Sequence, residues 1–98
     1  MIYDLLIADV AHMSGITLEE FTSTSRRSDI VRARQVAWYL LYHHYGWSYP
    51  VIARKAGKNH ATILHGCNHI MDLMVMHSDV KMMVEELKRI NYYQMLRC

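Results

Sequence analysis

The chain has 98 residues, of which 52% are hydrophobic, and its formal net charge is +2 at pH 7. This length predicts a single domain over residues 1–98, and no apolar run approaches the roughly 18–20 residues that span a bilayer. The first residues include two aspartates and no basic leader, so they do not resemble a secretion signal, and we expect a cytoplasmic location. The two cysteines are far apart and do not indicate a disulfide scaffold.

The charges are unevenly distributed along the chain. Seven basic residues and one acidic residue fall between Phe21 and Met71, whereas the flanks are acidic overall. A basic centre is typical of a surface that binds a polyanion. It also fits an ordinary solvated surface, and charge alone does not decide between the two.

One proline and four glycines favour an all-α fold with long helices and short turns. The first helix is predicted to end at Gly15 in a left-handed cap. Thr17 and Glu20 have the spacing of a capping box, which predicts a short second helix that Phe21 packs down, followed by a turn over residues 22–25. The apolar side chains expected in the first helix are those of Ile2, Leu5, Leu6, Ala8, Val10 and Met13.

A long third helix is predicted from about Ser28 to Tyr45, with Gly46 as its end. Arg32, Arg34 and Gln35 are expected to lie off its apolar stripe. The stripe consists of Ile30, Ala33, Val36, Ala37, Leu40 and Leu41.

The next two helices have the pattern of a helix-turn-helix. Ser48 is a predicted N-cap for a helix over residues 49–56, in which the missing proline amide costs nothing, and Gly57 ends it. Asn59 is a good N-cap for a longer helix, and a short helix, a glycine-bearing turn and a longer helix with a polar start are typical of this motif. A last helix capped by Ser78 gives six helices in total. The residues expected to face inward are Val51, Ile52, Ala56, Ile63, Leu64, Cys67, Ile70, Met71, Val80, Met83, Val84, Leu87 and Ile90.

The second helix of such a motif enters the major groove of DNA with its N-terminus first. Its opening residues have suitable chemistry: Asn59 offers a donor and an acceptor, His60 can donate to guanine, Ala61 can contact a thymine methyl, and Thr62 can bond a phosphate. The positive end of the helix dipole also favours phosphate. Similar helix triplets occur in proteins that do not bind DNA, so the pattern by itself is only moderately specific.

Several segments match one known family in order and spacing. They are Ser25–Arg27, Ile30–Ala37, Tyr39–Leu41, Ser48–Pro50, Ile52 and Asn59–His65. Together they resemble the C-terminal DNA-binding domain, domain IV, of the bacterial replication initiator DnaA. The resemblance covers nearly the whole chain, so we expect a stand-alone domain of the Trp repressor and DnaA C-terminal-like class.

The resemblance implies a surface that binds double-stranded DNA. An arginine of the basic loop would enter the minor groove, the recognition helix and the turn would read bases, and further side chains would hold phosphates. The matching residues are Arg26 for the minor groove, with Arg27 as its substitute; Tyr49, Pro50, Asn59, His60 and Ala61 for bases; and Arg34, Gln35, Lys58, Thr62 and His65 for phosphates.

The sequence also departs from the family. The family's R-D-H-T-T appears here as Lys58-Asn59-His60-Ala61-Thr62, and an amide in place of the carboxylate that accepts from cytosine prefers adenine, so we expect a related but different target site. The turn Lys55-Ala56-Gly57 is one residue shorter than in many relatives. The chain has no G-x-x-x-x-G-K-[ST] phosphate loop, so neither nucleotide binding nor ATPase activity is expected from it, and no cofactor. The function that remains is occupancy of a DNA site, which would regulate replication initiation or transcription. Recruitment of a protein partner is a further possibility.

Other functional classes have weaker support. His65 and His69 have a zinc-compatible spacing but no third ligand, and Cys67 diverges from His65, so neither a metal site nor a catalytic residue is expected and the chain is not predicted to be an enzyme.

A methionine cluster can form core or an adaptable partner surface, and core is favoured. Four aromatic residues near the groove can pack or be exposed. The competing function is a helical protein–protein adaptor that kept the fold and lost DNA binding. The methionines are Met71, Met74, Met76, Met82 and Met83, and the aromatic residues are Tyr42, Tyr45, Trp47 and Tyr49.

Overall fold

The computed structural model describes residues 2–90 and residue 92, and within them every regular element is a helix. The six predicted helices are confirmed. They are α1 (Ile2–Met13), α2 (Leu18–Thr22), α3 (Ser28–His43), α4 (Tyr49–Ala56), α5 (His60–Met76) and α6 (Ser78–Arg89).

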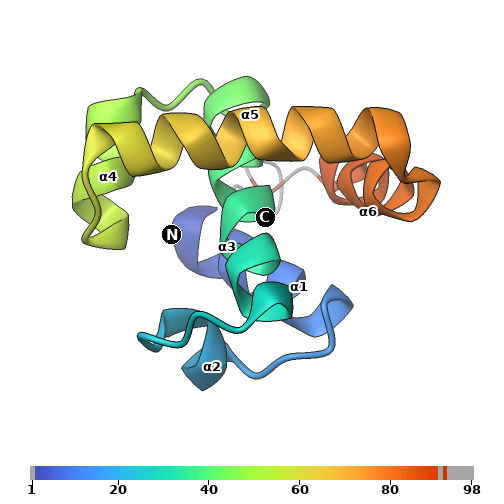
Figure 1. The fold of residues 1–98 in the computed structure, drawn as a ribbon, viewed down its shortest axis with the longest axis horizontal. Coiled ribbons are helices and arrows are strands. Elements are labelled where there is room, and N and C mark those ends of the chain that lie inside the picture. The colour runs from blue at the N-terminus through green and yellow to red at the C-terminus, as the bar shows by residue number, and fades with distance from the viewer. Residues whose placement is uncertain (1, 91, 93–98) are drawn as a thin grey trace.

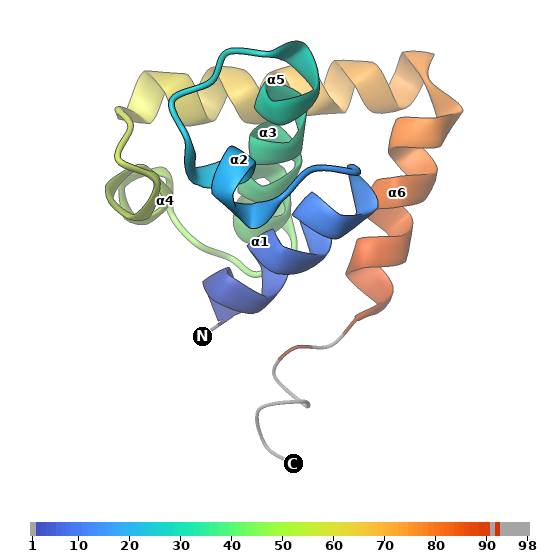
Figure 2. The same cartoon turned by 90° about the horizontal axis from the view of Figure 1, so that it is seen from below.

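Helix α3 is the centre of the fold. It runs through the middle of the molecule, α5 crosses over it, and α4 and α6 lie under opposite ends of α5 (Figure 1). The view turned by 90° places α1 and α2 on the side of α3 away from α5 (Figure 2). The predicted α3 stripe is confirmed, because all six of its residues are buried in the common core. Burial of these apolar side chains from both sides is the main force that holds the helices around α3.

Local sequence signals explain most helix ends. Thr17 and Glu20 form the predicted capping box, and Ser48 accepts from the amide of Val51 at the start of α4. Gly15 and Gly57 both adopt the left-handed conformation, with φ of 72° and 68°, where a Cβ is disfavoured. Two predicted ends shift: α3 stops at His43 rather than Tyr45, and Ser78 is the first residue of α6 rather than its cap, with no side-chain cap bond.

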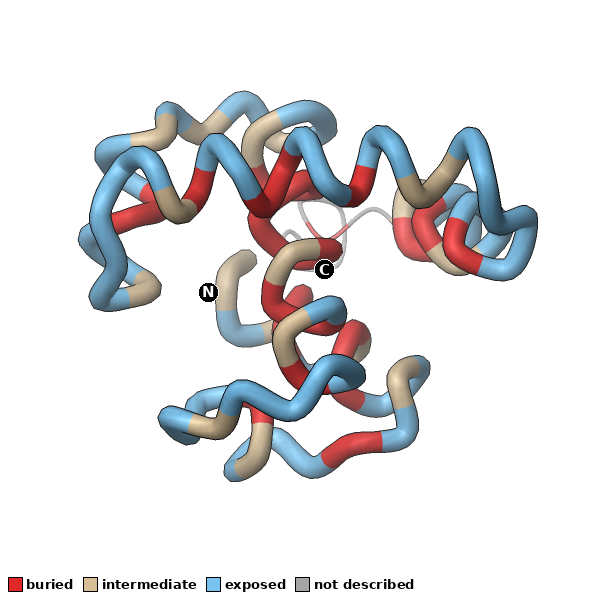
Figure 3. Tube along the Cα trace, in the orientation of Figure 1, coloured by how far each residue is buried: buried red, intermediate tan, exposed pale blue. Residues whose placement is uncertain are grey.

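Some residues predicted to face inward are exposed. Val51, Leu64 and Met71 lie on the outer faces of α4 and α5, so their expected burial was wrong. The inner face of α5 is instead centred on Ile63, Gly66, Cys67 and Ile70, since glycine lets α3 approach the helix at that point. Figure 3 shows the resulting alternation along α5, in which one face is buried and the outer face is open to solvent.

The methionine cluster is not core as favoured. Met76 and Met82 expose 73% and 70% of their surface, and Met74 and Met83 are only partly buried. Met76 is the last residue of α5 and Met82 lies on α6, and the last turns of α5 extend past α3 toward α6 (Figure 1).

The four aromatic residues that the sequence places near the DNA-binding surface are Tyr42, Tyr45, Trp47 and Tyr49. They are half-buried and pack against the core, which favours a packing role over an exposed one. Tyr42 stacks on Tyr49 at 4.1 Å between ring centroids, Trp47 stacks on Tyr3, and the Tyr45 hydroxyl donates to the Ile90 carbonyl.

Candidate nucleic-acid interface

The turn between α4 and α5 aims the start of α5 out of the molecule. Gly57 reverses the chain after α4, and Asn59 caps α5 through its Oδ1, which accepts from both the amide and the hydroxyl of Thr62 at 2.8 Å. A cap of this kind satisfies a free amide of the first helical turn and fixes where the helix begins. The confirmed capping therefore defines the geometry of every side chain in the first turn of α5.

The polar start of α5 projects outward, as expected. Lys58, Asn59, His60 and Ala61 are exposed, Thr62 is half-buried, and His65 is exposed one turn further along the helix. None of the basic side chains among them forms an ion pair within the part of the chain that the structure describes.

Helix α4 offers fewer exposed side chains to a ligand than the start of α5 does. Pro50 is exposed in its first turn, but Tyr49 is half-buried by its stack on Tyr42. Burial and the adjacent Tyr42 hydroxyl raise the pKa of Tyr49 above its ordinary value, so this phenol remains protonated and can donate a hydrogen bond at neutral pH.

The loop from Ser23 to Arg27, between α2 and α3, presents its two arginines differently. Arg27 is tied to its own domain, because its guanidinium pairs with Asp29 at 2.7 Å and with Glu20 at 3.0 Å. The hydrogen bond from Arg27 lowers the pKa of Asp29, and the pairing raises the pKa of Arg27. Arg26 is exposed and has no such partner among the described residues. Of the pair, Arg26 is therefore the one available to a ligand.

Arg34 corrects the sequence analysis. It was expected at the surface, off the apolar stripe, yet only 9% of it is exposed and it is the buried charged residue of the described chain. Its guanidinium donates to backbone carbonyls of Phe21, Ser23 and Ser25 at 2.6 to 2.8 Å. Burial lowers its pKa, although a guanidinium remains charged at neutral pH. These bonds satisfy backbone carbonyls at the C-terminal end of α2 and in the loop that follows it.

Gln35 also differs from its expected place. It is half-buried, and its Cγ lies in the contact between α3 and Gly66 of α5. Arg32, also on α3, is exposed, as expected for a residue off the apolar stripe.

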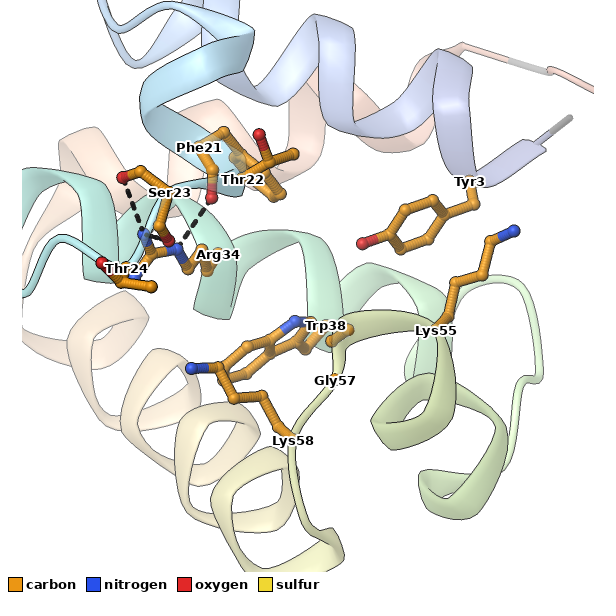
Figure 4. Close-up of a pocket in the computed structure, with 11 residues that line it drawn as sticks. Tyr3, Phe21, Thr22, Ser23, Thr24, Arg34, Trp38, Lys55, Gly57 and Lys58 are labelled. Carbon is orange, nitrogen blue, oxygen red and sulfur yellow. Dashed lines mark hydrogen bonds between the residues drawn. The ribbon is translucent and has the colours of Figure 1, made fainter.

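A hollow of about 330 Å³ joins the loop to the helix-turn-helix. Thr22, Ser23 and Thr24 line it on one side, and Gly57 and Lys58 line it on the other, with Trp38 and Arg34 between them (Figure 4). In Figure 2 this loop and α5 also lie along the same edge of the molecule. The Ser23–Arg27 loop and the turn that leads into α5 thus border the same hollow, and Lys58 is one of the residues that line it.

The groups considered for metal or nucleophilic chemistry do not assemble into a site. No cluster of three or more metal-ligating side chains occurs among the described residues. Cys67 is buried in the core, which raises the pKa of its thiol to about 11 and keeps it protonated. The described chain also has no helix with the length and apolar character that a membrane span requires.

Sequence reasoning missed the residues that shape the loop. Ser23 bridges it, because its hydroxyl donates to the Glu20 carbonyl at 2.6 Å and accepts from the Ser25 amide at 3.2 Å. The Ser25 hydroxyl accepts from the Arg27 amide in the same way. A run of Ser and Thr before a helix was a signal for such bonds. The inward turn of Arg34 had no comparable local signal.

The sequence matches the bacterial DnaA protein helix-turn-helix family over residues 3–70. The chromosomal replication initiator protein DnaA of Picosynechococcus sp. is 32% identical over 92 residues, which cover 92% of this chain and 20% of that protein. The proteins of the same name from Porphyromonas gingivalis and Streptococcus agalactiae are each 35% identical, over 83% and 81% of this chain. The chain spans about a fifth of the length of these relatives. With both the fold and the sequence in agreement, the chain belongs to the bacterial DnaA helix-turn-helix family.

Proposed function

We propose that this domain binds double-stranded DNA sequence-specifically, with the start of α5 in the major groove and the Arg26 loop in the adjacent minor groove. The family supports DNA binding in general, and the shared surface of the loop and the turn supports this particular arrangement. A phosphate backbone strand separates neighbouring grooves, so it would pass over the hollow between the two elements. Lys58 at its rim is suited to bond that strand.

Fewer residues are exposed enough to contact DNA than the family resemblance implied. Arg26 supplies the minor-groove contact, His60, Ala61 and the Asn59 amide meet base edges, and Pro50 borders them. Thr62 and His65 remain phosphate candidates, together with Lys58. We no longer propose direct phosphate contacts for Arg34, because its donors face the interior.

The cap geometry bears on base preference. Both hydrogen bonds from Thr62 end on Asn59 Oδ1, so that oxygen is occupied and the Nδ2 group is the free one. A twofold bond to adenine, as the amide suggested, would cost the domain these cap bonds. We therefore expect Asn59 to act as a donor, toward an acceptor such as guanine O6 or N7 or thymine O4. The target site would then differ from one read by a carboxylate at this position.

The biological output of such binding is occupancy of a site. The 98 residues contain no phosphate-binding loop, so we propose a role in control of replication initiation or of transcription that does not need ATPase activity from this chain.

A protein–protein adaptor is the second candidate, and the exposed methionines at the junction of α5 and α6 favour it. An adaptor role does not account for the exposed basic side chains at the opposite end of α5, which form no ion pair with any residue that the structure describes.

Selection from randomised duplexes, followed by titration of the selected duplex across salt concentrations, tests the proposal. A DNA-binding domain loses affinity steeply as salt rises, in proportion to the phosphates contacted. His60→Ala is expected to lose about 1–3 kcal/mol on the selected site with little change on random DNA. Lys58→Ala is expected to weaken binding to all sequences and to lower the salt slope by about one. If no sequence is enriched and binding does not depend on salt, the adaptor interpretation replaces this one.

A further inference from the structure

Arg34 links the core to the loop that carries Arg26. Its side chain leaves α3, passes beside the hollow and ends among backbone carbonyls, as Figure 4 shows. Nε donates to Phe21 O at 2.8 Å, Nη1 to Ser25 O at 2.7 Å and Nη2 to Ser23 O at 2.6 Å. One guanidinium therefore bonds the end of α2 and two points of the loop at the same time.

The shape of the guanidinium matters for this bonding. A guanidinium is planar and directs its N–H groups outward as a fixed fork, so three separated carbonyls can each receive a donor. A lysine ammonium presents its donors from a single point on a flexible stem and cannot reach all three. For phosphate, in contrast, lysine is an effective partner. Replacement of Arg34 by lysine therefore separates two roles. A phosphate contact would largely survive the replacement, whereas the bonds to the three loop carbonyls would not.

We propose that Arg34 is a positioning residue, which fixes the Ser23–Arg27 loop in the form that presents Arg26 to DNA and does not itself bind phosphate. This inference rests on the proposed function for its DNA-binding part. The loop has no regular secondary structure and its side chains are mostly exposed. Its other bonds join exposed groups, so the buried guanidinium of Arg34 is its main link to the interior of the domain. An ordered loop spares the entropy that Arg26 would otherwise lose on entering a groove.

The test uses Arg34→Lys, with Arg32→Lys on the exposed side of the same helix as the matched control. Both variants keep the charge, so nonspecific attraction to DNA is preserved. We expect Arg34→Lys to lose roughly tenfold in affinity for the selected duplex, similar to Arg26→Ala, whereas Arg32→Lys stays within about twofold of the original protein. In the Arg26→Ala background, Arg34→Lys should cause little further loss, because the two residues act through one contact.

A second readout needs no DNA. Amide hydrogen exchange over residues 23–27 of the free protein should quicken in Arg34→Lys and remain unchanged in Arg32→Lys. Binding by Arg34→Lys that equals the original protein, or a loop that keeps its protection, overturns the positioning role. If the original protein binds no duplex, the proposed function is wrong, and so is the proposal that Arg34 supports DNA binding. The exchange data would still show whether Arg34 orders the loop.

Ser23→Ala covers the case in which Arg34→Lys does not fold. This exposed residue bridges the same loop through its hydroxyl and lies outside the hydrophobic core, so we expect the Ser23→Ala domain to fold. Faster exchange of the loop together with weaker specific binding supports the link between loop order and affinity. Faster exchange with unchanged binding refutes it.

Discussion

Gly66 lies where α5 crosses α3, and its replacement by alanine tests how closely the two helices are packed. A Cβ at this position would lie 2.7 and 2.9 Å from two ring carbons of Trp38 and 3.0 Å from Cγ of Gln35. Carbon atoms prefer separations of about 3.5–4.0 Å, so the contact must open by nearly 1 Å. Trp38 is 5% exposed and borders the hollow on one side only, so relief of the clash requires its buried ring to shift toward that hollow.

Two effects of opposite sign determine the result for Gly66→Ala. In an open helix the change stabilises by about 1 kcal/mol, because glycine has the poorer helix propensity. Overpacking of a close contact costs about 1–3 kcal/mol. We therefore expect the free energy of unfolding to fall by up to about 2 kcal/mol, with a lower Tm.

Chemical denaturation of Gly66→Ala beside Asn68→Ala measures this balance. Asn68 is exposed on the same helix, so its replacement should reveal the propensity gain without a clash. Adding Trp38→Leu, which removes the ring, should recover part of the loss in a double-mutant cycle. If Gly66→Ala stabilises the protein as Asn68→Ala does, the helices are not in the close contact described. A folded Gly66→Ala domain should also bind DNA less tightly, because α5 and the Arg26 loop would shift relative to each other.

Three further predictions follow from side-chain chemistry. Asn59→Asp keeps a capping oxygen but exchanges the free donor for an acceptor, so duplex selection should return a different base at one position; an identical preference would contradict the donor role. The Asp29 pKa, lowered by its hydrogen bond from Arg27, should rise in Arg27→Ala when measured by NMR titration. Because the folded-state pKa is depressed, the ion pair contributes above the ordinary carboxyl pKa and is lost as the pH falls through the lowered value. Buried Cys67, with its pKa raised to about 11, should resist thiol reagents in a Cys98→Ser background until the domain unfolds, and rapid labelling would show that the site is open.

The sequence by itself determined the helices and their order. Capping residues and left-handed glycines act within a few residues, so the box at Thr17 and Glu20, the cap at Asn59 and the end at Gly57 were all predictable. Apolar spacing likewise gave the buried stripe of α3. The outward start of α5 was predictable for the same reason, since its polar residues follow directly from the cap.

Only the tertiary structure decided which side of each outer helix is covered and where long side chains end. Gly66 lets α3 approach α5, which turns Leu64 and Met71 toward solvent, and the last turns of α5 extend beyond α3. Arg34 turns inward because carbonyls from residues 9 to 13 positions earlier lie within its reach. Such contacts depend on how the chain folds back on itself, and periodicity along one helix carries no information about them.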